Sequence, residues 1–102
     1  MRIHPAGMSV VQTVVTLTAT VDATIVAANS NRKYLAIINI NTGLATLAFD
    51  TAAVAGQGWP LSAAASAGDQ GGAVVFEASA ITQQAVHAIS TAGTTLVVLE
   101  GI

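Results

Sequence analysis

The clearest pattern of hydrophobic and polar positions lies in residues 34–40, which read Tyr-Leu-Ala-Ile-Ile-Asn-Ile. β-branched and aromatic residues without Gly or Pro predict a strand. Alternate side chains of a strand point to opposite faces, and here both faces are mainly apolar. Such a strand is covered on both sides. The pattern therefore places residues 34–40 centrally in a sandwich or against a neighbouring subunit, with Leu35, Ile37, Ile38 and Ile40 mostly buried.

Six further segments carry the signals of short strands. They are rich in Val, Ile and Thr, or they alternate polar with apolar residues, as residues 16–21 do with period two. Between them lie turn signals built from Asn, Ser and Gly. The predicted additional strands are residues 9–21, 24–27, 45–49, 73–78, 85–90 and 94–100.

About seven short strands without a convincing helix predict an all-β fold, an antiparallel β-sandwich or a jelly-roll-like barrel. The segment 41–43, Asn-Thr-Gly, contains a glycine that can take a positive φ. We therefore expect residues 34–40 and 45–49 to form a β-hairpin.

The predicted domain organisation is a tail at residues 1–8 and a single β domain at residues 9–102. A long loop at residues 50–72 contains five glycines and one proline, and shows no strand or helix pattern. Ordering its backbone costs on the order of 1–2 kcal/mol per residue, and only Val54, Trp59 and Leu61 can bury much apolar area. We expect contacts with another chain to order this loop, with Trp59 as the anchor.

The charge content changes this picture of an ordinary β domain. Only 8% of the 102 residues are Asp, Glu, Lys or Arg, against about 25% in a typical soluble domain. A genomic bias toward Ala, Gly and Val explains part of this. Charged residues are also depleted from the cores of protein interfaces, and a charge-poor surface suits a freely diffusing monomer poorly. The composition therefore predicts a homo-oligomer.

Other partners are not indicated. The net charge is −2, and the pair Arg32 and Lys33 is too small for the phosphate contacts of a nucleic-acid interface. Every apolar run is shorter than the roughly 18 residues that a membrane helix needs. We predict no nucleic-acid and no membrane partner.

Candidate chemistry is sparse. His4 lies in the predicted tail and His87 in a predicted strand, and the five acidic residues are isolated along the chain. No nucleophile elbow or metal-ligand spacing is present, and the glycine cluster at residues 68–72 lacks the Lys-Ser/Thr of a phosphate loop. We predict no enzyme, no catalytic residue, no cofactor and no metal site. A small hydrolase would need His87 and two acidic residues in one pocket.

Four residues are candidates for partner or subunit contacts: Arg32, Lys33, Tyr34 and Trp59. The two basic residues have a simpler interpretation as solubilising charges at a strand edge, or as one ion pair across a subunit boundary. Trp59 is a contact for a partner or a sugar if it is exposed. It is equally well interpreted as a plug at the end of the sandwich.

Residues 29–39, Asn-Ser-Asn-Arg-Lys-Tyr-Leu-Ala-Ile-Ile-Asn, resemble a stretch in small structural proteins of tailed-bacteriophage heads. Residues 47–49, 53–61 and 86–101 are similar to later elements of the same group in order and spacing. The resemblance covers roughly residues 28–101. His87 stands where these proteins have an aromatic residue, often Tyr.

The resemblance implies a virion protein that decorates or cements the capsid, or attaches fibres to it, as a symmetric oligomer. It implies a trimer, the major capsid protein as partner, production in the bacterial host cytoplasm, a place on the capsid surface and no enzymatic activity. The alternative is a β module on the phage head or tail, such as a head fibre or adhesin, that binds glycans or the host surface.

Overall fold

The computed structural model describes residues 9–102, and the predicted tail at residues 1–8 lies outside the described residues. Residues 9–102 are all-β, with eight antiparallel strands and a single turn of 3-10 helix, η1 (Ala78–Ala80). The strands are β1 (Val10–Leu17), β2 (Ala23–Val26), β3 (Tyr34–Asn39), β4 (Ala45–Phe49), β5 (Trp59–Leu61), β6 (Ala73–Glu77), β7 (Val86–Ile89) and β8 (Thr94–Gly101).

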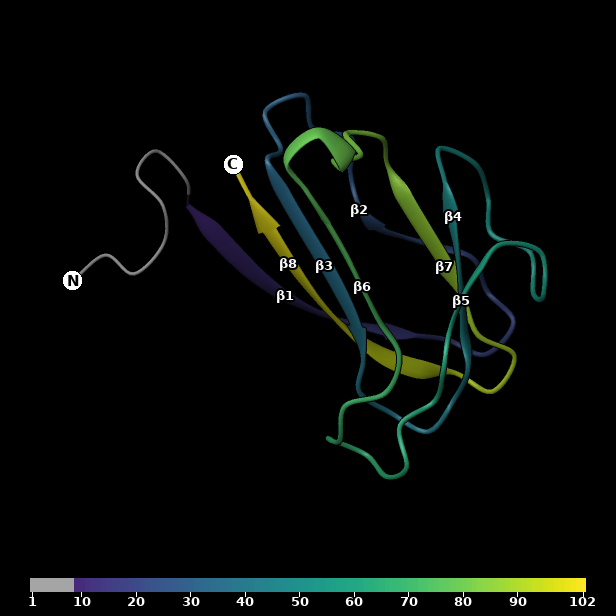
Figure 1. Ribbon diagram of the computed structural model, residues 1–102. Helices are drawn as coiled ribbons and strands as arrows, with labels where there is room; N and C mark the ends of the chain where they lie inside the picture. The colour runs from purple at the N-terminus through teal and green to yellow at the C-terminus, as the bar shows by residue number, and fades with distance from the viewer. Residues whose placement is uncertain (1–8) are drawn as a thin grey trace.

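The strands form two sheets of four that face each other (Figure 1). The first sheet has the strand order β1-β8-β3-β6, and the second has the order β2-β7-β4-β5. Every connection except the one between β4 and β5 therefore crosses from one sheet to the other. The hydrophobic core lies between the two sheets.

The core is built from the inward-pointing half of each strand. On β3 the side chains of Leu35 and Ile37 are fully buried, and on β8 those of Leu96 and Val98 are buried beside them. The second sheet contributes Leu47, Val86 and other aliphatic residues to the same cluster. Strand alternation explains this arrangement, because every second side chain points to the same face.

The predicted central strand is only partly covered. β3 does lie between β8 and β6, and Leu35 and Ile37 are buried as expected. Ile38 and Ile40 keep more of their surface exposed than Leu35 and Ile37, although most of each residue is still covered. The reason is that one face of β3 points at the second sheet, whereas the other face points out of the sandwich.

The prediction that β3 and β4 form a hairpin is wrong, because the two strands belong to different sheets. The buried Asn39 side chain donates hydrogen bonds to the carbonyls of Gly43 (2.8 Å) and Leu61 (3.2 Å), which fixes the turn after β3 inside the fold. A Cβ at Gly43 would stand 2.1 Å from the carbonyl oxygen of Gly93, so this turn packs against the turn after β7. These contacts direct the chain to the second sheet.

The structure adds a strand where the sequence predicted a loop, which makes eight strands instead of seven. β5 pairs with β4 through only three residues, one of which is Pro60. Such a short, proline-containing strand gives no periodic signal. The following segment donates backbone hydrogen bonds from Ala64, Gly68 and Gly71 to the carbonyls of residues 39–41. The chain's own backbone therefore orders much of the loop, contrary to the expectation that another chain does so.

Candidate interaction surface

The outer face is our name for the side chains of the first sheet that point away from the second sheet. Strand register places them in rows across β1, β8, β3 and β6. The two central rows are Gln12, Leu99, Ala36 and Val75, and then Val14, Val97, Ile38 and Ala73. All of these except Gln12 are apolar, so the middle of the sheet presents a hydrophobic surface.

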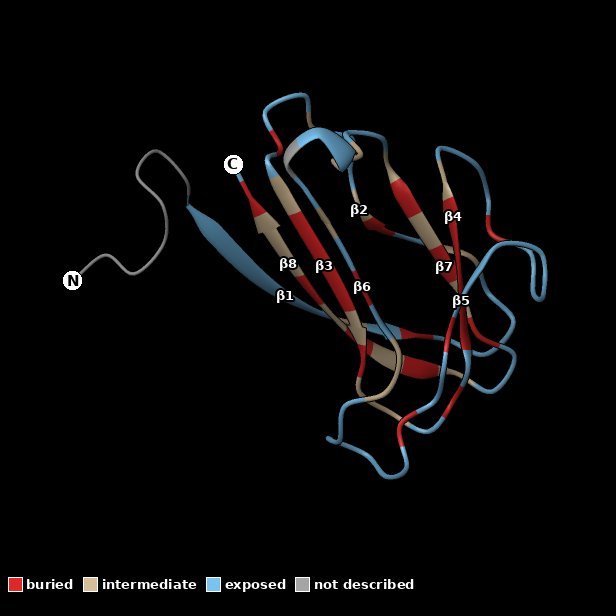
Figure 2. Ribbon diagram, viewed as in Figure 1, coloured by how far each residue is buried: buried red, intermediate tan, exposed pale blue. Residues whose placement is uncertain are grey.

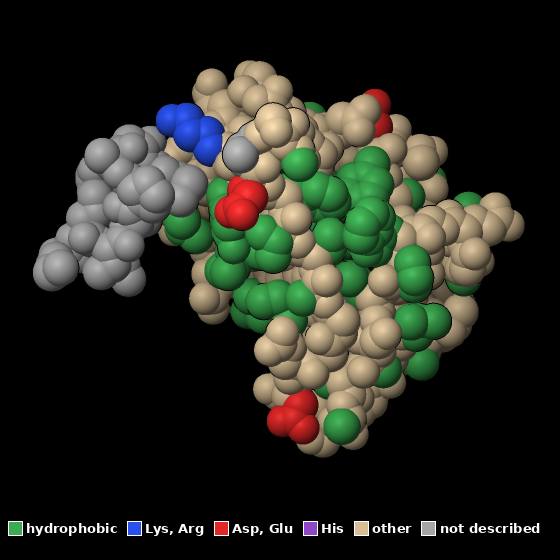
Figure 3. Space-filling model, viewed as in Figure 1, with side chains coloured by type: hydrophobic (Ala, Val, Ile, Leu, Met, Phe, Trp, Pro, Cys, Tyr) green, Lys and Arg blue, Asp and Glu red, His purple; other side chains and the backbone are tan. Residues whose placement is uncertain are grey.

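Much of this face is open in the single chain, although Ala36 in one of the central rows is buried. Val14 and Val75 are 58% and 52% exposed, and Val97, Leu99 and Ile38 between them are half-buried. Figure 3 shows hydrophobic side chains gathered over β6 and beside it. Soluble monomers rarely expose large contiguous apolar patches, and larger ones mark interaction sites.

Charge is confined to the margin of the outer face. The row at one end of the sheet consists of Val10, Gly101, Tyr34 and Glu77. Glu77 carries the carboxylate of this row. The central rows carry no ionisable side chain. Covering these rows with a partner would therefore not desolvate a charge.

An aromatic cluster lies at the side of the sandwich where β5 and β6 form the sheet edges. The ring of Phe76 contacts Phe49 edge-on at a centroid distance of 5.6 Å, and contacts Trp59 at 6.1 Å. Trp59 is still 47% exposed. The ring packs against the sandwich and also presents a surface to solvent, so both interpretations of Trp59 stay predictions.

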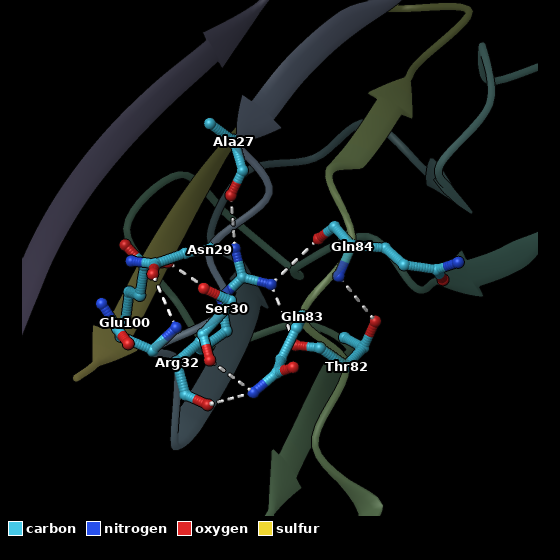
Figure 4. Close-up of polar contacts among 9 residues, drawn as sticks. Ala27, Asn29, Ser30, Arg32, Thr82, Gln83, Gln84 and Glu100 are labelled. Atoms are coloured by element: carbon cyan, nitrogen blue, oxygen red, sulfur yellow. Dashed lines mark hydrogen bonds and ion pairs between the residues drawn. The ribbon is translucent and has the colours of Figure 1, made fainter.

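Arg32 occupies a different place from the one expected. It is 1% exposed, and Figure 4 shows its guanidinium enclosed by groups of the same chain. Its Nε donates to Glu100 Oε2 at 2.8 Å, and Nη1 donates to the carbonyls of Thr82 and Gln84, each at 2.9 Å. Its Nη2 donates to the carbonyl of Ala27 at 2.5 Å. The ion pair expected across a subunit boundary is made within the chain instead.

The neighbouring candidates remain at the surface. Lys33 is exposed, and its backbone N–H bonds the carbonyl of Gly101 at 2.7 Å. Tyr34 is half-buried at the margin of the outer face. From the sequence, Arg32 and Lys33 are both candidates for partner contacts, because both follow a polar turn. Only tertiary contacts distinguish the buried Arg32 from the exposed Lys33.

The outer-face residues on β1, β6 and β8 were not predicted as a site. For β8 a signal is present in the sequence, since residues 94–100, like residues 34–40, carry apolar side chains on both faces. The pattern could not say which face would meet the second sheet.

His87 pairs with one acidic residue. Its Nδ1 lies 3.2 Å from Asp22 Oδ2, and Asp22 Oδ1 accepts a hydrogen bond from the backbone N–H of Ala53 at 2.7 Å. Residues 9–102 contain no pocket and no group of three His, Cys, Asp or Glu side chains placed to hold a metal ion. The requirement stated for a hydrolase, His87 with two acidic residues in one pocket, is not met in this part of the chain. Asp22 instead ties the turn after β1 to the segment after β4.

The hydrogen bond from Ala53 holds the pKa of Asp22 below its ordinary value of 3.8, with a smaller contribution from His87, against the opposing effect of desolvation. An acid with a lowered folded-state pKa stabilises the fold above its unfolded-state pKa, and this stabilisation is lost as the pH falls through the folded-state pKa.

We expect Asp22→Asn to reduce the loss of stability in acid, by less than about 1 kcal/mol because partly exposed pairs contribute little. Urea unfolding between about pH 6 and pH 2 measures this. Thr42→Asn, at an exposed position without a titratable side chain, is the control and keeps the acid loss of the unmodified protein. Identical acid profiles for the Asp22→Asn variant and the unmodified protein would contradict the assignment.

No helix in the described part of the chain has the length and hydrophobicity needed to cross a membrane. Comparison of the chain with protein-family models, with curated proteins and with solved structures finds no match.

Proposed function

We propose that this protein is a structural virion protein of a tailed bacteriophage that decorates or cements the outside of the capsid as a symmetric homo-oligomer. The observation that carries the assembly role is the apolar outer face of the first sheet, with its uncharged central rows. The phage context comes from the resemblance of residues 29–39 and the later segments. No part of the proposal involves catalysis.

The energetics of such a surface favour assembly. Burying apolar area contributes roughly 25 cal/mol per Å². The exposed side chains of Val14 and Val75 supply such area, and the half-buried Val97 and Leu99 supply less. An uncharged interface also avoids the cost of desolvating unpaired ions. The same surface in a permanent monomer would be an aggregation hazard.

We also propose that the sandwich is a jelly roll. Its strand pairs are β1 with β8, β2 with β7, β3 with β6 and β4 with β5. This nesting is what results when one long hairpin, closed between β4 and β5, is wrapped into two sheets. Jelly rolls occur in viral capsid domains and in lectin domains. The topology is thus compatible with a virion role but does not select it, because a fold does not fix a function.

The half-exposed ring of Trp59 favours a second candidate, a glycan- or host-surface-binding module. Exposed aromatic rings commonly contact sugars and protein partners. The described residues form no pocket around this ring, and the ring already packs against Phe76 in a T-shaped arrangement. We therefore rank this candidate below assembly on the capsid.

Val97→Glu tests the assembly role, because it places a charge in a central row of the outer face. We expect the unmodified protein to sediment as an oligomer, a trimer by the resemblance, and the variant to associate at least about tenfold more weakly, since an unpaired charge in an interface costs several kcal/mol. Sedimentation equilibrium measures both, with the exposed turn variant Thr42→Glu as the control. A monomeric unmodified protein at micromolar concentration would overturn the proposal.

The virion context has its own test. Mass spectrometry of purified virions gives the presence and copy number of the protein, and cryo-electron microscopy gives its location. A regular copy number on the capsid exterior supports decoration or cementing. Restriction to a few copies on fibres, together with glycan binding that Trp59→Ala abolishes, would support the second candidate instead.

A further inference from the structure

β1 is a long strand with little cover from its own chain. Six of its eight residues are exposed. Val10, Val11 and Val14 are 42%, 53% and 58% exposed, and they lie on both faces of the strand. Figure 2 shows β1 coloured as exposed along most of its length, at the margin of a sheet whose β3 and β8 carry buried residues. β1 pairs with β8 along one side, and its other edge has no partner strand among the described residues.

The hydrogen-bonding groups at this free edge can be assigned. Ser9 and Ile102 exchange both of their backbone hydrogen bonds, at 2.8 and 2.9 Å. In an antiparallel pair, such hydrogen-bonded positions alternate with positions whose N–H and C=O point the other way. The backbone groups of Val10, Gln12, Val14 and Thr16 therefore point to the free edge, and those of residues 11, 13, 15 and 17 point to β8.

The other edge strands among the described residues are blunted, whereas β1 is not. β2 has four residues and an irregular register, and β5 has three residues including Pro60. β6 has five residues and ends in Glu77. Proteins usually protect free edges by shortness, proline, irregularity or charge. β1 has none of these protections, which is typical of an edge that pairs with a strand of another chain.

We propose that a second copy of this chain pairs with β1 along its free edge, antiparallel, with the two β1 strands related by a two-fold axis that passes between their Thr13 residues. This register lets all four outward-pointing residues find partners: Gln12 opposite Val14, and Val10 opposite Thr16 of the other copy. The two first sheets become one continuous sheet, and their outer faces lie on the same side.

A second copy fits this edge because β1 carries no charge that an identical strand would repel. A two-fold contact brings the residues near its axis close to their own counterparts, so an ionisable residue in the middle of β1 would lie near a like charge. Residues 9–21 contain no ionisable side chain. Across the proposed pair, the exposed Val11 lies opposite the half-buried Val15, which places two apolar side chains against each other.

This proposal deepens the proposed function, since it names one contact of the homo-oligomer and rests on self-assembly. A two-fold contact alone closes a dimer. A trimer would need a separate contact, for which the outer face is available.

The test uses cysteine crosslinking, because the chain contains no cysteine. In a non-hydrogen-bonded antiparallel pair, facing Cα atoms are about 4.5 Å apart, within the range that a disulfide spans. Thr13→Cys should therefore give mostly disulfide-linked dimer under mild oxidation. Gln12→Cys is the matched control, because the proposed register sets Gln12 opposite Val14, and it should remain mostly unlinked.

A second variant removes a single edge donor. Gln12→Pro deletes an N–H that points to the free edge, so pairing with β8 should survive and the circular dichroism spectrum should stay that of a β protein. Sedimentation equilibrium should show at least about tenfold weaker association, since the proline also obstructs the partner strand.

The outcomes separate this contact from the proposed function. If the protein is an oligomer but Thr13→Cys does not crosslink, or crosslinks no better than Gln12→Cys, the β1 contact is overturned and self-assembly by another surface stands. An unmodified protein that is monomeric overturns both. Selective crosslinking of Thr13→Cys in a protein absent from virions supports the contact and overturns only the phage role.

Discussion

Replacing Arg32 with alanine is expected to lower the free energy of unfolding by about 3–5 kcal/mol, the usual cost of removing one partner from a buried, hydrogen-bonded ion pair. The guanidinium is fully buried, and it bonds Glu100 and three backbone carbonyls. These groups belong to β8, to the segment before β7 and to the segment after β2. The substitution therefore removes a connection between three parts of the chain at once.

Arg32→Lys should recover only part of this stability. Lysine keeps the positive charge, but its single ammonium group cannot reproduce the planar set of donors that reaches four acceptors in different directions. We expect its loss to lie between that of the alanine variant and zero. Ser30→Ala, at an exposed position of the same turn, should change stability by no more than about 0.5 kcal/mol.

Urea unfolding followed by tryptophan fluorescence measures all three variants, with Trp59 as the natural probe. Domains of this size are usually stable by about 5–15 kcal/mol, so the Arg32→Ala variant should be visibly less stable at 37 °C. An Arg32→Ala variant within about 1 kcal/mol of the unmodified protein would show that the buried cluster is not a stabilising connection.

Asn39→Ala is expected to destabilise the fold by about 2–4 kcal/mol, because it leaves several buried polar groups without partners. The Asn39 side chain is 0% exposed. Its amide nitrogen donates to the carbonyls of Gly43 and Leu61, and its Oδ1 accepts from Thr94 Oγ1 at 2.8 Å. One side chain thus joins the end of β3 to the turn before β4, to β5 and to β8.

Asn39→Asp provides a sharper test, because it keeps the shape of the side chain. An ionised carboxylate would face two carbonyl oxygens, so the folded state should raise the pKa of this carboxyl above the usual value of about 3.9. With a raised folded-state pKa, stability is greatest below the unfolded-state pKa and falls as the pH rises through the folded-state pKa.

The two Asn39 variants are measured by urea unfolding at several pH values. The Asn39→Asp variant should lose stability between about pH 4 and pH 7 relative to the unmodified protein. Asn31→Ala, in the exposed turn before β3, serves as the control and should stay within about 0.5 kcal/mol. Stability of Asn39→Asp that is independent of pH in this range would contradict the role of Asn39 as a donor.

The sequence by itself determined where most strands lie. A strand is present at each of the seven predicted segments, and the all-β class is confirmed. These features depend on local properties: β-branched residues favour extended backbone, period-two alternation matches the pleat, and Gly or Asn residues mark turns. Each such signal is contained in a few neighbouring residues, so it can be recognised without knowing the fold.

Only the tertiary structure decided which strands pair and which faces are covered. β3 and β4 are joined by a short turn, yet their separate sheets follow from the contacts of Asn39 and Gly43 with residues far along the chain. Arg32 is buried because Glu100 and the carbonyls of Thr82 and Gln84 converge on it. The outer face and the free edge of β1 also exist only once strand order is set. Pairing and burial depend on residues distant in sequence, and no local pattern encodes them.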